Sequence, residues 1–346
     1  MERRPLWLRI GAFSVLFFLL FSLVFAAALT VGTVPISFQE TAGLLGAWLH
    51  GERGAMSPHG VILFQIRLPR IILCVLAGAA LSMAGTAFQA LLRNPLADPY
   101  IIGTSSGAAL GASLSIVWGF GQPIGGISAV PLMAFLGSLG AMLLVYGISL
   151  REGRLPLDTF LLSGVIVGAF AGALISLLMT VAGEDLPRIV FWLMGSFSGR
   201  ESWSYVALMA PYWLLGTLVL YGCSHHLNVL SMGDEAASSR GLPVEKAKVI
   251  IIFSASLVTA AAVSVCGLVG FVGLMIPHVM RRIVGPDHRL LLVASLFGGA
   301  VFLMATDTVA RTMFAPEEIP VGVITALCGA PIFFWIMKMR RDRREG

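Results

Sequence analysis

The residues of this sequence that could do chemistry are few and scattered. Its four cysteines stand singly in apolar stretches, without a CxxC pair or a nearby group of histidines, so we expect reduced packing residues and no metal site. No GxxxxGK(S/T) segment is present to hold nucleotide phosphates, and neither an HExxH motif nor paired carboxylates at spanning depth are present for catalysis. The sequence therefore predicts a protein that is not an enzyme, with no catalytic residue and no cofactor, and it assigns any ATP hydrolysis to a partner chain.

The charges most open to interpretation are three arginines beside long apolar runs. Arg67 and Arg70 precede one such run, and Arg311 follows another. An arginine in this position can anchor a helix by extending its guanidinium to the membrane interface. Asp307 lies four residues before Arg311, so the two can pair on one helix face. We expect Asp307 to have a structural role rather than to carry protons.

These charges must be positioned by a chain that is mostly apolar. Of its 346 residues, 57% are hydrophobic and only 12% are charged, whereas an ordinary soluble domain carries about 25% charged residues. Lipid is therefore its main solvent. The net charge of +5 does not indicate a nucleic-acid partner, because the basic residues lie in short loops between apolar runs.

The apolar runs set the topology, since a spanning helix needs about 20 residues. The first run, 10–31, follows three arginines but is longer than the core of a signal peptide, so a retained helix is expected. The run 100–150 is divided into two helices by the turn-rich cluster 119–126. The remaining runs are 71–92, 159–183, 202–230, 249–280, 290–306 and 319–337.

The run 249–280 is interrupted by three glycines and Pro277, and the distribution of charge decides whether it crosses the membrane once or twice. Two crossings place 17 of the 23 Lys and Arg residues inside and 6 outside, whereas one crossing places 10 inside and 13 outside. Only two crossings satisfy the positive-inside rule. The sequence thus predicts an all-α, polytopic membrane protein, a single domain of residues 1–346 with about ten transmembrane helices, a short and broken eighth helix, and both termini in the cytoplasm.

An ordered set of segments along nearly the whole chain carries a family resemblance. The segments are RLPR at 67–70, GAALSMAG at 78–85, NPLADP at 94–99, GTSSGAALGA at 103–112, GLVGFVGLMIPHVMRRIVGPDHR at 267–289, ATDTVAR at 305–311 and EIPVGVITALCGAPIFFW at 318–335. Together they resemble the FecCD-type permeases of bacterial ATP-driven importers for iron-siderophore complexes, haem and vitamin B12.

The resemblance implies the fold of a type II ABC importer permease in the bacterial cell (inner) membrane. It implies a homodimer, or a pair with a close paralogue, surrounded by lipid. Two ATP-binding subunits would sit at the cytoplasmic face and a substrate-binding protein at the outer face. The substrate stays open among siderophore complexes, haem and cobalamin.

The resemblance also assigns roles to particular residues. Arginines at the positions of Arg67, Arg70 and Arg311 would pair with glutamates of the binding protein at the outer face, a contact suited to charge-assisted bonds. Arg188 and Arg200 lie on the same side but match no motif of the family.

The inner loop 225–248 would couple the permease to its ATPase. Its centre, 233–241, is small and polar, and Asp234 and Glu235 can begin a short interfacial helix. The coupling positions implied by the resemblance are Gly233, Ala237, Arg240, Gly241 and Leu242.

A possible cytoplasmic gate falls at Leu157, Asp158 and Thr159, where Leu157 and Asp158 stand in place of the family's small hydroxyl residues. An alternative function is an ion-coupled secondary transporter, because interrupted helices such as 267–277 mark substrate sites in those proteins. That alternative lacks a buried acidic pair to carry the ion. A membrane-embedded enzyme lacks the motifs named above.

Overall fold

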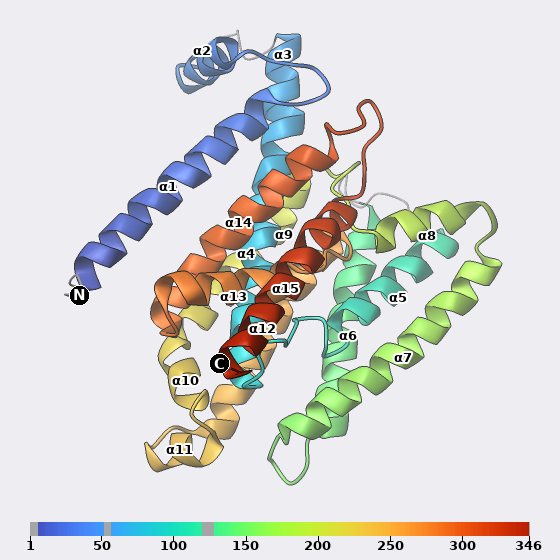
Figure 1. Cartoon of the computed structure of the whole chain (residues 1–346). Helices are drawn as coiled ribbons and strands as arrows, with labels where there is room; N and C mark the ends of the chain where they lie inside the picture. Colours follow the sequence, from blue (N-terminus) through green and yellow to red (C-terminus); the bar gives the residue numbers. More distant parts are fainter. Residues whose placement is uncertain (1–5, 52–56, 120–127, 346) are drawn as a thin grey trace.

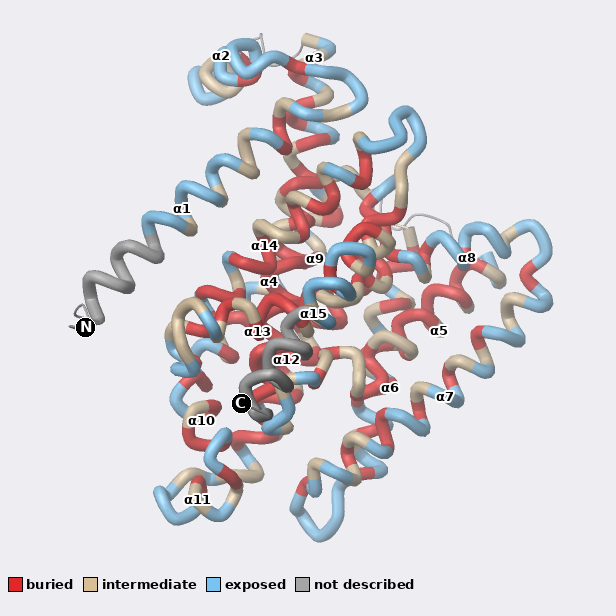
Figure 2. The backbone as a smooth tube through the Cα atoms, viewed as in Figure 1, coloured by how far each residue is buried: buried red, intermediate tan, exposed pale blue. Residues whose placement is uncertain are grey.

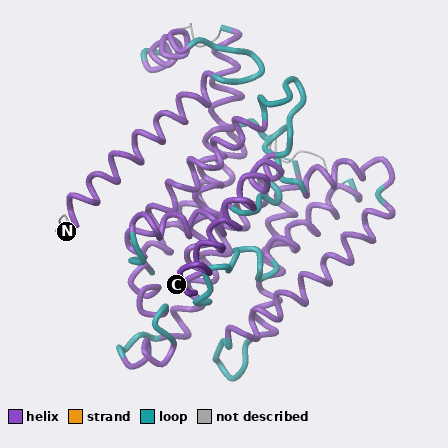
Figure 3. The backbone as a smooth tube through the Cα atoms, viewed as in Figure 1, coloured by secondary structure: helices purple, strands orange, loops and turns teal. Residues whose placement is uncertain are grey.

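The computed structural model describes residues 6–51, 57–119 and 128–345, and within them the fold is helical without a β-strand (Figure 3). Six helical segments there are long and apolar enough to cross a membrane, and three shorter apolar helices accompany them. With the 13-residue α13 these make a bundle of ten helices among the described residues (Figure 1). They are α1 (Leu6–Thr30), α4 (Leu68–Leu91), α5 (Thr104–Val117), α6 (Ala129–Ser149), α7 (Leu157–Val181), α9 (Trp203–Gly222), α12 (Val244–Cys266), α13 (Val272–Val284), α14 (His288–Ala310) and α15 (Val321–Glu345).

Short helices lie at the two ends of this bundle (Figure 1). One end, which we call the α2 face, carries α2 (Phe38–Leu49), α3 (Pro58–Val61) and the loop 311–320. The opposite end, the α11 face, carries α10 (Ser224–Leu230), α11 (Asp234–Ser239) and the loop 150–156. The remaining short elements are η2 (Ile62–Arg67), η3 (Gly183–Asp185) and α8 (Leu186–Leu193). The predicted all-helical fold is confirmed.

The centre of the bundle is α4, which packs against α9, α12, α13 and α14. Of its most apolar window 89% is buried, against 28% for α7 at the periphery, a contrast visible in Figure 2. Small residues make this packing possible. A Cβ on Gly78 would stand 2.2 Å from the carbonyl oxygen of Gly299, and one on Gly85 would stand 1.9 Å from that of Gly273. The helix backbones are therefore in direct contact, as small residues permit in membranes.

The predicted break in the run 249–280 is present. Helix α12 ends at Cys266, and Gly267 takes a positive φ of 69°, which glycine adopts without steric cost. Phe271, at φ 68°, directly precedes α13, and Pro277 lies inside that short helix. The predicted short eighth helix, α13, therefore follows the break directly.

Two helix boundaries differ from the prediction. The second spanning helix starts at Pro58 rather than near 71, because η2 runs directly into α4, so Arg67 and Arg70 lie within the helix. The sixth ends at Gly222 and is followed by α10 as a separate helix. Of the predicted turn cluster 119–126, only Gly119 lies within the described residues.

Candidate functional sites at the two ends of the bundle

Near the α2 face, Arg70 joins three acidic residues from different elements. Its Nε and Nη2 donate to the two carboxylate oxygens of Asp307 on α14 at 3.0 and 2.9 Å. Its Nη1 donates to Glu318, in the segment before α15, at 2.9 Å and to Glu201, before α9, at 3.0 Å. The Arg70 side chain is 5% exposed, so these charge-assisted bonds form in a largely water-free setting. We call these four residues the Arg70 cluster.

The other two arginines hold the end of α1. Arg67 donates from Nη1 to the carbonyl oxygens of Leu29 at 2.7 Å and Thr30 at 3.2 Å, and Arg311 donates to that of Ala28. The last carbonyls of a helix have no partner within it and carry partial negative charge, so a guanidinium satisfies them. These two arginines thus fasten α1 to the bundle.

All three arginines predicted to dock a binding protein are therefore buried and bonded within the chain. Contact with a partner would require Arg67 and Arg70 to exchange an internal acceptor for an external one, whereas the Nε of Arg311 has no acceptor among the described residues. The docking role stays a prediction. Asp307 has the structural pairing that we expected, but its ion pair is with Arg70 rather than with Arg311.

At the α11 face, a buried lysine joins three elements. Lys248 on α12 is 3% exposed, and its Nζ lies 2.6 Å from Oδ2 of Asp234 on α11 and 3.0 Å from Oε1 of Glu245. It also donates to the carbonyl oxygen of Leu155 at 3.4 Å, while the Leu155 N–H donates to Glu245 Oε2 at 2.7 Å. We call this arrangement the Lys248 junction. It links α11, α12 and the loop between α6 and α7.

The predicted coupling residues come together in and around α11. The helix begins directly after Gly233, whose φ is 111°, and Ala237 is its fully buried residue. Arg240 and Gly241 follow as exposed residues, while Leu242 packs partly against the core. The short helix expected in this loop is therefore present.

The predicted gate residues begin α7, directly after the loop held by the Lys248 junction. Asp158 is exposed and Leu157 and Thr159 are half-buried. The structure thus connects α11 to this segment through Leu155, Glu245 and Lys248, which the sequence reasoning did not single out. The available signal was the spacing of Glu245 and Lys248, three residues apart at the start of an apolar helix.

The described residues contain no group of three or more His, Cys, Asp and Glu side chains that could hold a metal ion. Neither end of the bundle therefore offers a protein-built metal centre within that part of the chain. Both ends offer instead networks of ion pairs that connect helices.

Comparison with known proteins gives consistent matches over almost the whole chain. The model of the FecCD transport family matches residues 19–339. The hemin transport system permease protein HmuU of Yersinia pestis is 38% identical over 337 residues, covering 95% of this chain and 96% of that protein. The cobalamin import system permease protein BtuC of Halobacterium salinarum is 44% identical over 283 residues, covering 82% and 75%.

A solved structure agrees with these sequence matches. It is described as an inward-facing conformation of an ABC transporter of the metal-chelate type, and it superimposes with a TM-score of 0.81 at 32% sequence identity. The superposition covers 93% of this chain and 97% of the other. The arrangement of helices is therefore that of a transporter permease.

Proposed function

This chain belongs to the FecCD transport family, and from that membership we propose how it works and what it carries. It is the multi-pass permease subunit of an ABC importer, in which separate nucleotide-binding subunits hydrolyse ATP. Its substrate is an iron chelate, haem or cobalamin, classes for which several of its relatives are named. The observation that carries this proposal is the family match over residues 19–339.

The α11 face is proposed to be cytoplasmic and the α2 face to be the outer one, in the cell membrane. This orientation puts both termini and 17 of the 23 Lys and Arg residues on the cytoplasmic side. It follows the tendency of basic loops to stay inside. Residues 1–346 then act as a single permease domain.

Two copies of the ATPase subunit are proposed to dock at the α11 face, one on each permease. Support comes from α11, which projects from the bundle (Figure 1) and borders a hollow of about 570 Å³ lined by Glu235, Ser238 and Leu242. Because the Lys248 junction joins α11 to the loop before Leu157, a displacement of α11 moves that loop as well. Nucleotide-driven closure of the ATPases would in this way bias the segment at the start of α7.

A substrate-binding protein is proposed to dock at the α2 face. Arg67 and Arg70 would engage its carboxylates only after releasing their present partners, while Arg311 has one donor, its Nε, without a partner among the described residues. Such an exchange would loosen the contacts between α1, α4 and α14, so docking and rearrangement of this face would be linked.

A second copy of the chain, or a close paralogue, is proposed to cover part of α7. Among the six candidate membrane spans of the described residues, α7 and α9 are the least buried. The side chains of Leu162, Phe170 and Leu177 on α7 are each 60% or more exposed. A Cβ on Gly172 would meet no atom within 4 Å, so the middle of α7 is open. Lipid would cover the rest.

A secondary transporter is favoured by one observation, the break between α12 and α13. The backbone there is already engaged, however. Tyr100 Oη donates to the carbonyl oxygen of Val269 at 3.0 Å and accepts from its N–H at 3.2 Å, and Ser196 N–H donates to the carbonyl oxygen of Cys266 at 2.8 Å. The carbonyl groups of Val269 and Cys266 therefore already accept hydrogen bonds within the chain, which favours the importer.

Uptake by cells tests the proposal. A strain without this chain should lose uptake of one radiolabelled substrate among a ferric siderophore, haemin and cyanocobalamin, and the cloned chain should restore it. Depletion of ATP with the proton gradient maintained should abolish that uptake. Uptake that persists without ATP would overturn the proposal.

A further inference from the structure

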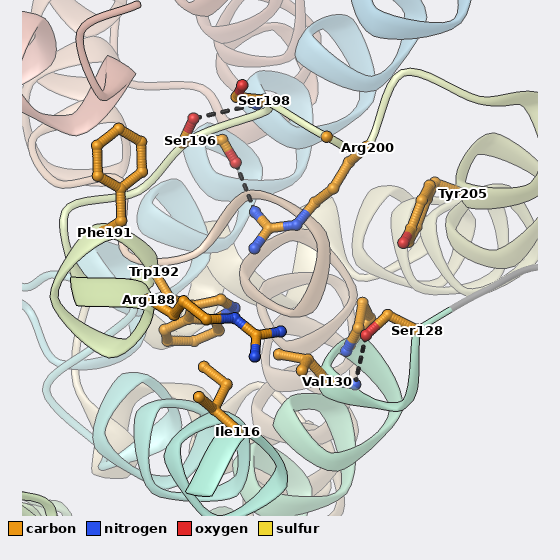
Figure 4. A pocket seen from close by; sticks show the side chains of 12 residues that line it. Ile116, Ser128, Val130, Arg188, Phe191, Trp192, Ser196, Ser198, Arg200 and Tyr205 are labelled. Atoms are coloured by element: carbon orange, nitrogen blue, oxygen red, sulfur yellow. Dashed lines mark hydrogen bonds between the residues drawn. The ribbon is translucent and has the colours of Figure 1, made fainter. Parts of the chain in front are cut away.

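A cavity of about 220 Å³ lies on the α2 face, between the end of α5, the start of α6, α8 and the segment before α9 (Figure 4). Its lining includes two arginines and three serines. Arg188 of α8 and Arg200 of the α8–α9 segment extend their guanidinium groups toward the same space, as Figure 4 shows. We call it the Arg200 cavity.

Arg200 has no carboxylate within 4.0 Å among the described residues. Its Nη1 donates to the carbonyl oxygen of Ser196 at 2.5 Å, and the adjacent Glu201 is bonded to Arg70. Burial lowers the pKa of Arg200 from its ordinary value, and the neighbouring Glu201 only partly offsets this effect. A guanidinium nevertheless stays charged in proteins, so this partly buried cation has no carboxylate among the described residues to balance it.

Trp192 provides a second, independent indication. It lines the cavity, it is 4% exposed, and its indole N–H has no hydrogen-bond acceptor among the described residues. A buried donor without an acceptor is costly and calls for a partner. A bound acceptor atom in the cavity would supply one.

The start of α6 adds to the positive potential. Ser128 and Val130 line the cavity, with the Ser128 hydroxyl accepting from the Val130 N–H at 3.3 Å as the cap of this 21-residue helix. The N-terminus of a helix favours an anion. Arg188 is 67% exposed and pairs with Asp185 at 2.8 Å, so the nearest carboxylate is already used.

We propose that the Arg200 cavity binds an oxyanion group, a carboxylate or phosphate, of the substrate as it reaches the permease at the α2 face. The cavity volume suits one arm of a chelate rather than a whole chelate, since pockets for drug-sized ligands measure about 300 to 1,000 Å³. Arg200 and Arg188 would bind the oxygens with charge-assisted bonds and Trp192 would donate one more. This inference rests on the proposed function, and it favours substrates with an anionic group.

The test is direct binding to the full-length permease in nanodiscs of zwitterionic phosphatidylcholine, without ATPase or binding protein. Radiolabelled citrate and inorganic phosphate serve as probes. Citrate should bind, and Arg200→Gln should weaken binding by about tenfold or more, as loss of a charged hydrogen-bond donor implies. Arg200→Lys should retain part of the affinity, and Arg282→Gln, on an exposed residue near the other face, should leave it unchanged.

Arg188→Gln keeps the test decisive if Arg200→Gln fails to fold, because the exposed Arg188 side chain contributes little to packing. This variant should weaken citrate binding by about threefold, since its guanidinium is shared with Asp185 and water. Binding of neither probe, or equal binding by the wild type, Arg188→Gln and Arg200→Gln, would overturn the proposal.

The same chemistry would also suit the phosphate of an anionic lipid headgroup. Nanodiscs containing phosphatidylglycerol distinguish the two sources. If phosphatidylglycerol abolishes citrate binding and stays bound in native mass spectrometry to the wild type but not to Arg200→Gln, the assignment to substrate is overturned. Because no ATP-dependent step is measured, a failure here is separate from a failure of the importer function.

Discussion

Replacement of Lys248 by Met should uncouple ATP hydrolysis from transport. The substitution keeps the length of the side chain and removes the Nζ that bonds Asp234, Glu245 and the Leu155 carbonyl. The bond from the Leu155 N–H to Glu245 remains, so the loop keeps half of its connection to α12. The connection to α11 through Asp234 is lost.

The free-energy cost of Lys248→Met depends on how far the carboxylates of Asp234 and Glu245 are exposed to water. Removal of one member of a fully buried ion pair costs about 3 to 5 kcal/mol because the other charge stays in the protein. Here Asp234 and Glu245 are 44% and 35% exposed, so water can rehydrate both carboxylates. We therefore expect a loss of about 1 to 2 kcal/mol, which shifts the population of the linked arrangement by roughly 5- to 30-fold.

The assay measures ATP hydrolysis and uptake in the same proteoliposomes. Lys248→Met should hydrolyse ATP at a normal rate, because the ATPase site is in the partner, while substrate carried per ATP falls by roughly the factor above. Arg282→Met is the control, since Arg282 is an exposed cation that does not line the hollow beside α11, and it should transport normally. An unchanged ratio of uptake to hydrolysis in Lys248→Met would refute the role of the junction.

Three further predictions concern stability and coupling. Gly241 has a φ of 80°, so Gly241→Val should strain the end of α11 by about 1 to 2 kcal/mol and reduce uptake more than ATP hydrolysis; wild-type coupling would contradict this. Arg70→Leu leaves the buried Asp307 carboxylate unpaired and should lower the free energy of unfolding by about 3 to 5 kcal/mol, measured by thermal unfolding in detergent. The double variant Arg70→Leu with Asp307→Leu should recover much of that loss, and no recovery would show that the pair is not the cause. Gly78→Ala should prevent folded expression because its Cβ would overlap the α14 backbone, whereas Gly172→Ala should be tolerated, and equal expression of the two would contradict the close packing.

The helical fold and the approximate number of its apolar helices could be predicted because they depend on properties that are local in sequence. The length of each apolar run and the charge of each loop report directly on what lipid and the membrane interface tolerate. The break after Cys266 was visible for the same reason, since glycine and Pro277 act on the backbone where they stand. The start of α11 at Asp234 also follows from local composition.

The partners of Arg67 and Arg70 could not be predicted from neighbouring residues. The sequence places Arg67 and Arg70 before a helix, because a charge in an apolar segment is costly without a partner. Their partners are distant in sequence: Arg70 pairs with Asp307, 237 residues away. The four-residue spacing favours an ion pair between Asp307 and Arg311. In the folded chain Asp307 forms its ion pair with Arg70 instead.

The Lys248 junction and the Arg200 cavity were missed for a related reason. The junction depends on the backbone of Leu155, which carries no side-chain signal and lies 93 residues from Lys248. The cavity depends on four elements that meet only in the folded bundle. Arg200 was noticed as a charge on the outer side, but nothing in sequence indicates which cations lack a carboxylate.

ATP-dependent uptake in a defined system tests the central claim most directly. Proteoliposomes would contain this chain with its ATPase subunit, with the binding protein and radiolabelled substrate on the side of the α2 face and ATP on the other, and ionophores would remove all ion gradients. The account predicts accumulation with ATP and none with a non-hydrolysable analogue. Accumulation driven by a proton or sodium gradient in the absence of ATP would contradict it.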